Sequence, residues 1–104
     1  MANAHRGEIE AELSGRTYVL CLTLGALAEL EHAYGGEDLI AIAQRFEAGK
    51  ITASDAIRVI GAGLRGAGNV VSDEEVADMR AAGGAQGFLA IVVRLLRATF
   101  AGET

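Results

Sequence analysis

The sequence contains no proline and no tryptophan, and it has a single cysteine. One cysteine cannot form an intramolecular disulfide. Because proline is the strongest helix breaker, its absence, together with many alanines, favours a helix-rich chain in which the 14 glycines mark the breaks. Cys21 lies between Leu20 and Leu22, so we expect a buried, inert thiol; a reactive site is the alternative.

Basic residues and long apolar runs are also scarce. Nine lysines and arginines stand against 14 acidic residues, which gives a net charge of −5. An acidic chain repels phosphate backbones, so we expect no nucleic-acid binding. The longest apolar runs, 18–22 and 88–93, are far shorter than the roughly 20 residues that cross a bilayer, so we expect no membrane span. The charged N-terminus does not resemble a secretory signal, which predicts a cytoplasmic protein.

Residues 7–23 show a period of two. Apolar residues alternate with glutamates from Glu8 to Leu13, and Ser14-Gly15 then interrupts the pattern before a second apolar run. This arrangement is typical of a two-stranded hairpin with one solvent-exposed face. Because a lone hairpin is marginal in water, we expect its apolar face to pack on helices.

Helical spacing and helix caps account for the remaining residues, 24–101. The expected helices are a first that follows the cap Thr23 and ends at Gly35-Gly36, a second from Glu37 to Ala48, a third from Ala53, a fourth from Asp73 to about Ala82, and a fifth from about Ala85 to Ala101. Thr52 with Asp55, and Ser72 with Glu75, have capping-box spacing. The sequence therefore predicts an α+β fold, mainly α, in which an N-terminal β-hairpin packs on about five short helices within one domain, 1–104.

The stretch IRVIGAGLRGAG contains Gly-x-Gly-x-x-Gly, the spelling of a dinucleotide-binding turn. Such a turn needs a strand entering the first glycine and a helix leaving the third. On a helical wheel, the preceding residues divide into an inner edge of Ala53, Ile57, Ile60 and Leu64 and an outer face of Ser54, Asp55, Arg58, Ala62 and Arg65. We therefore interpret the segment as an amphipathic helix, with Gly61 and Gly63 close to a neighbouring helix and Gly66 or Gly68 as its stop.

No group of residues has the spacing of a catalytic or metal site. The two histidines, His5 and His32, lack metal-ligand spacing and are expected to face solvent. Acidic pairs such as Glu37-Asp38 begin helices, where the helix dipole accounts for them. We expect no enzyme activity, no metal and no cofactor.

The fifth predicted helix carries more apolar surface than a small core requires. Its inner stripe consists of Phe88, Ile91, Val92 and Leu95. A second, outer stripe consists of Leu89, Val93, Leu96 and Phe100, with only Arg94 and Arg97 clearly opposite. Either the hairpin buries the outer stripe or a partner does, and the second alternative makes these four residues the candidate partner-binding site.

Residues of about 5–100 resemble small proteins encoded in gene transfer agent and related siphophage tail modules. The resemblance is carried by HRGEIEAELSGRTYVLCLTLGALAELEHAYG, by EDLIAIAQRFEAGKITASDAIRVIGAGLRGAG and by the cap-bearing SDEEV. Its clearest parts are the hairpin running into LTLGALAELE and the segment D-x-x-x-[VL]-[IL]-x-A-G-L-R. That family is grouped with phage tail assembly chaperones, although its name also carries the label of GTA phage tail tube protein.

The resemblance implies a non-enzymatic chaperone in the cytoplasm of a bacterial host. It would bind the tape measure protein, the major tail protein or both, while the tail is assembled. The resemblance leaves open whether the protein also forms a homo-oligomer. The resemblance assigns no functional residue. One alternative is a structural tail tube or connector component of the particle. A further alternative is a small DNA-binding regulator. In that case the third predicted helix would enter the major groove, with Arg58 and Arg65 on its outward face.

Overall fold

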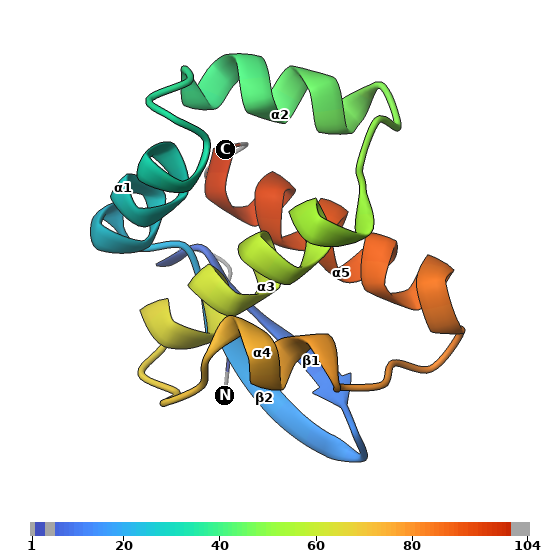
Figure 1. Cartoon of the computed structure of the whole chain (residues 1–104). Coiled ribbons are helices and arrows are strands. Elements are labelled where there is room, and N and C mark those ends of the chain that lie inside the picture. Colours follow the sequence, from blue (N-terminus) through green and yellow to red (C-terminus); the bar gives the residue numbers. More distant parts are fainter. Residues whose placement is uncertain (1, 4–5, 101–104) are drawn as a thin grey trace.

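The chain begins with the hairpin that its alternating pattern predicts (Figure 1). Strand β1 (Glu8–Leu13) pairs antiparallel with β2 (Arg16–Cys21). Ser14 and Gly15 have φ angles of 53° and 79°, the left-handed pair that a tight two-residue turn requires. The computed structural model describes residues 2–3 and 6–100. Within them, two strands and five helices confirm the α+β, mainly α, fold.

The five helices begin largely where the sequence predicts caps. They are α1 (Leu24–Ala33), α2 (Leu39–Glu47), α3 (Ala53–Gly66), α4 (Asp73–Ala77) and α5 (Gly84–Phe100). Thr23 caps α1 by accepting a hydrogen bond from a backbone N–H three residues later, at 3.1 Å. The capping boxes Thr52–Asp55 and Ser72–Glu75 both form. Each of them satisfies two backbone N–H groups that the first helical turn leaves unpaired.

Helix α3 lies at the centre of the fold and packs on β2, α1, α4 and α5 (Figure 1). Its buried surface is much wider than the predicted inner edge. Asp55 and Ala62 are buried, although the helical wheel placed them on the outer face, and Ala53 is exposed, although the wheel placed it inside. The single-edge prediction is wrong because neighbours surround this helix on several sides.

The glycines of α3 allow its neighbours to approach closely. A Cβ atom on Gly63 would lie 2.6 Å from Cδ2 of Leu95 in α5. A Cβ atom on Gly66 would overlap the backbone carbonyl oxygen of Cys21 in β2. Gly68, with φ of 96°, then takes the left-handed conformation that follows the helix end. The Gly-x-Gly-x-x-Gly motif therefore reflects helix packing and helix termination, because the residues that precede its first glycine form a helix and not a strand.

Helix α4 is shorter than predicted. It ends at Ala77, whereas the sequence pattern extended it to about Ala82. The backbone N–H of Ser14 donates to the carbonyl oxygen of Arg80 at 2.7 Å, and the N–H of Arg80 donates to Oγ of Ser14 at 3.1 Å. Because the hairpin turn occupies both backbone groups of Arg80, a contact distant in sequence ends the helix.

Helix α5 covers the hairpin. It begins at Gly84 and is described as far as Phe100; its predicted last residue, Ala101, lies outside the described residues. Its inner stripe lies in the core, with Val92 and Leu95 fully buried. The helix packs on both strands and on α3. Neither α5 nor any other helix in the described part of the chain has the length and apolar content of a membrane span.

Candidate partner-binding site

The outer stripe of α5 is not buried by the hairpin. Its end residues, Leu89 and Phe100, are 37% and 43% exposed, and the two residues between them are half-buried. The hairpin packs instead near Arg94, whose Nη2 donates to the carbonyl oxygen of Glu10 at 2.6 Å. The outer stripe therefore stays on the surface of the described structure.

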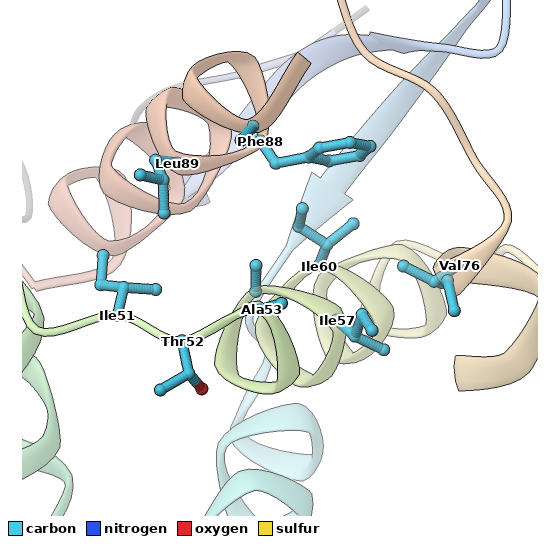
Figure 2. Close-up of a pocket in the computed structure, with 11 residues that line it drawn as sticks. Ile51, Thr52, Ala53, Ile57, Ile60, Val76, Phe88 and Leu89 are labelled. Atoms are coloured by element: carbon cyan, nitrogen blue, oxygen red, sulfur yellow. The ribbon is translucent and has the colours of Figure 1, made fainter.

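At the N-terminal end of the outer stripe, Leu89 lines a hollow between α3, α4 and α5 (Figure 2). The hollow has a volume of about 290 Å³, and Thr52 is its one polar lining residue. Its apolar walls include Ile51, Ile57, Ile60, Val76 and Phe88. Such a hollow suits a large apolar side chain rather than a charged group.

At the C-terminal end, Leu96 and Phe100 face α2 across a second hollow of about 330 Å³. Ile40 lies on its edge and is 60% exposed. Glu47 and Arg97 add charges of opposite sign to the lining. Arg97, which the sequence placed opposite the two apolar stripes, lines this hollow together with Leu96 and Phe100.

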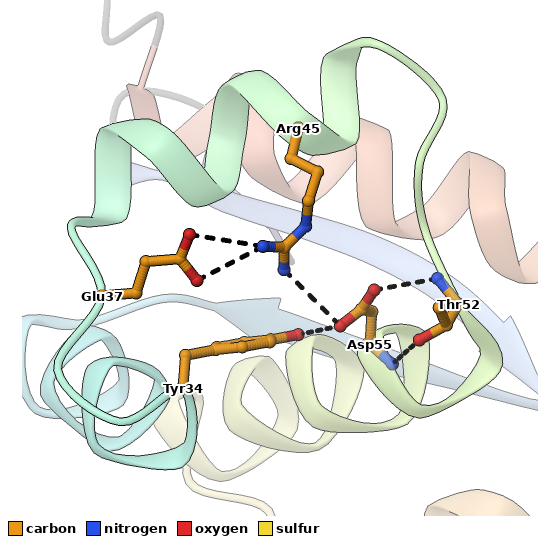
Figure 3. Close-up of polar contacts among 5 residues, drawn as sticks. All are labelled: Tyr34, Glu37, Arg45, Thr52 and Asp55. Atoms are coloured by element: carbon orange, nitrogen blue, oxygen red, sulfur yellow. Dashed lines mark hydrogen bonds and ion pairs between the residues drawn. The ribbon is translucent and has the colours of Figure 1, made fainter.

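Next to α2, a polar network surrounds the buried carboxylate of Asp55 (Figure 3). Asp55 is 5% exposed; it accepts hydrogen bonds from the hydroxyl of Tyr34 and, at 2.9 Å, from the backbone N–H of Thr52. Nη2 of Arg45 lies 3.9 Å from Oδ1 of Asp55, and its Nη1 lies 3.3 Å from Oε1 of Glu37. The network links α1, α2 and α3, and α2 takes part in it through one arginine.

Asp55 makes the fold sensitive to acid. Burial alone would raise the pKa of its carboxyl group, but hydrogen bonds with Thr52 and Tyr34 and the charge of Arg45 hold that pKa below its usual value. Burial and the Asp55 hydrogen bond also raise the pKa of Tyr34 to about 12, so its hydroxyl keeps the proton that it donates. A carboxyl group with a lowered folded pKa stabilises the fold above its unfolded pKa, and this contribution is lost as the pH falls through the folded value.

We therefore predict that acid weakens the wild type more than the variant Asp55→Asn, which has no charge to lose at this position. Urea unfolding at about pH 6 and about pH 3 measures the difference. The gap in unfolding free energy between the two proteins should shrink at the lower pH. An unchanged gap would show that ionised Asp55 does not stabilise the fold.

The structure describes Cys21 and one of the two histidines, His32. Cys21 is half-buried rather than fully buried, and its thiol donates to the carbonyl oxygen of Arg6 at 3.5 Å. Burial, followed by the carboxylate of Glu8, raises the pKa of this thiol, which keeps it protonated at neutral pH. His32 is exposed, as predicted, and His5 lies outside the described residues. Within residues 2–3 and 6–100, no cluster of three or more histidine, cysteine or acidic residues is placed to hold a metal.

The two arginines of the DNA-binding alternative are already engaged. The guanidinium of Arg65 pairs with Glu29 and, at 3.0 Å, with Asp73. That of Arg58 lies over the ring of Tyr34, 5.3 Å from its centroid. Since Arg65 already has two carboxylate partners, its charge offers little attraction to a phosphate backbone.

Sequence reasoning identified the outer stripe but missed the residues around it. Ile40, which is 60% exposed on α2, was not predicted to belong to the site. Asp55 was explained locally as part of a capping box, so nothing in the pattern showed that Tyr34 and Arg45 meet it. The signal that the sequence did offer for Ile40 was a large apolar residue on the outer side of a short amphipathic helix.

The whole described fold falls within one known family. The model of the family described as phage tail tube protein, GTA-gp10, matches residues 6–102, which include both strands, all five described helices and the outer stripe. No curated protein and no solved structure matches the chain. The family match confirms the resemblance to tail proteins of gene transfer agents and phages, and it supports a tail-related role. The chain belongs to the family of the phage tail tube protein, GTA-gp10.

Proposed function

We propose that this protein is a non-enzymatic tail assembly chaperone. It binds an amphipathic helix of the tape measure protein, the major tail protein or both, and shields apolar surface until the tail subunits polymerise. The outer stripe of α5 supports this proposal most directly, because it stays on the surface with a hollow at each end.

The geometry of the outer stripe suits a helical partner. Its four residues recur at intervals of three or four along α5 and cover about 16 Å. An edge of this kind packs against the apolar edge of a second helix, and the end hollows accept its larger side chains. The net charge of −5 favours a partner helix with basic residues on its other faces.

The double variant Leu89→Ser, Phe100→Ser tests the outer stripe at its two exposed ends. We predict that co-purification with the co-expressed tape measure or major tail protein falls about tenfold or more, because two apolar anchors are lost at the interface. The melting temperature should change little, since neither side chain belongs to the buried core.

Leu24→Ser is the matched control for this variant. Leu24 is 84% exposed at the start of α1, outside the outer stripe, and its replacement should leave binding unchanged. Full binding by the folded double variant would count against the outer stripe as the binding site.

A structural tail component is the second candidate, because the family description itself names a tail tube protein. A tube subunit remains in the finished particle, whereas a chaperone leaves it. Quantitative mass spectrometry of purified particles distinguishes the two. Trace amounts would support the chaperone, and many copies per particle would establish the structural role instead.

A further inference from the structure

Helix α2 lies beside the C-terminal half of the outer stripe. Val93 and Leu96 share one hollow with Phe46 of α2. Leu96 and Phe100 share another with Ile40 of α2. A partner helix that follows the whole outer stripe therefore meets α2 before it can cover Leu96, and only the Leu89 end is clear of α2.

The attachment of α2 to the rest of the fold is limited. Two of its side chains, Ile42 and Phe46, are buried. Among the helices and strands, α5 is its main packing partner, and hollows remain between the two. Within residues 2–3 and 6–100, a single ion pair ties α2 to another helix, the one between Arg45 and Asp55. The second partner of Arg45, Glu37, lies in the connection just before α2.

Glycines flank α2 on both sides. Gly35 and Gly36, with φ of 71° and 88°, lie between α1 and α2, and Gly49, with φ of 84°, lies between α2 and α3. Apart from the adjacent residues in the chain, no atom lies within 4 Å of the positions that their Cβ atoms would take, so these glycines are not required for close packing. Because glycine adopts the widest range of backbone conformations, both connections can accommodate a change in the position of α2.

The face next to α2 shows what kind of helix fits there. Leu39, Ile42 and Phe46 of α2 stand at i, i+3 and i+7 and share an apolar hollow with α1, α3 and α5 residues that include Leu30, Val59 and Leu96. Arg45, at i+6, lies 5.3 Å from the centroid of the Phe46 ring and reaches Asp55. An incoming helix with the same spacing and a basic residue at i+6 would reproduce these contacts.

We propose that α2 is a displaceable strap, and that the face it covers on α3 and α5 is the docking site for a partner helix of this pattern. The identity of that partner rests on the proposed function. In the free chain α2 occupies the site and keeps its apolar surface from water. A partner helix that replaces α2 gains the entire outer stripe, including Leu96 and Phe100.

Native-state hydrogen exchange on the full chain tests the strap without any partner. We expect the amides of α2 to exchange about tenfold or more faster than those of α3, through a local opening with little dependence on denaturant. If the amides of α2 and α3 exchange only through the same global unfolding, the proposal that α2 is a displaceable strap is wrong.

The variant Arg45→Gln tests the same proposal in the presence of the tape measure protein. Loss of the tie to Asp55 should populate the open form and tighten binding about threefold or more, while it lowers the melting temperature. Thr23→Ala, which removes the cap of α1, is the control: it should destabilise the fold without a gain in affinity.

The two proposals fail in different ways. Unchanged or weaker binding by folded Arg45→Gln would overturn the strap even though the chaperone binds its partner. If the wild type binds no tail protein, the proposed function is wrong, and the exchange experiment alone decides whether α2 opens.

Discussion

Replacing Asp55 with alanine is expected to lower the free energy of unfolding by about 3 kcal/mol. The hydroxyl of Tyr34 and the backbone N–H of Thr52 would lose their acceptor in a partly buried site. Arg45 would lose its partner on α3. Donors left without an acceptor away from water cost more than the net value of the bonds they made, which is why this polar residue matters as much as a core residue.

Urea unfolding at neutral pH measures this change. Asp55→Asn keeps one acceptor oxygen and should cost less than Asp55→Ala. Asp73→Ala removes a carboxylate that also pairs with an arginine but is 44% exposed, so it should cost less than about 1 kcal/mol. Equal losses for Asp55→Ala and Asp73→Ala would show that the buried network does not hold the helices together.

Replacing Gly66 with alanine is expected to cost about 3 kcal/mol. The added Cβ would overlap the backbone carbonyl oxygen of Cys21 and come within 3.3 Å of Cβ of Ala26. Neither obstacle is the end of a flexible side chain, so α3 would have to move away from β2 and α1. The resulting loss of packing in the centre of the fold should exceed the gain in helix propensity from alanine.

Gly25→Ala is the matched control, because it adds the same methyl group to another helix. The nearest atom to its new Cβ would be Oγ1 of Thr23 at 3.9 Å, an ordinary contact. We expect this variant to be more stable than the wild type by about 0.5–1 kcal/mol, and Gly66→Ala to be less stable. Thermal unfolding with opposite shifts in melting temperature would confirm both, and equal shifts would contradict the close approach at Gly66.

The features that the sequence predicts well depend on neighbouring residues. The hairpin follows from alternation and a Ser14-Gly15 turn, and three helices start at the caps Thr23, Thr52 and Ser72. In each of these places the hydrogen bonds close within a few residues. A short stretch of sequence therefore contains the whole physical cause.

The features that the sequence does not predict depend on contacts between distant residues. Helix α4 stops early because Arg80 binds the hairpin turn at Ser14. Asp55 is buried because Tyr34, at the C-terminal end of α1, and Arg45, on α2, meet it. A helical wheel contains no information about such neighbours, and it fails most at α3, which has neighbours on several sides.

The candidate site was predicted in part for the same reason. Spacing alone identified the outer stripe, since its residues share one edge of α5. The two hollows and the position of α2 arise from how four helices pack, so periodicity could not reveal them. Whether the four stripe residues bind a partner stays a prediction.

The placement of α5 also affects the protein while it is being synthesised. Leu13 and Leu20 of the hairpin are fully buried, yet α5, which covers the hairpin, is the last described helix. At about 5–20 residues per second, roughly 4–15 s separate the translation of Leu20 from that of Leu95. During this interval the nascent hairpin lacks its cover. A ribosome-associated factor that binds the hairpin would protect it from pairing with another chain, whereas slower translation of residues 21–95 would lengthen its exposure.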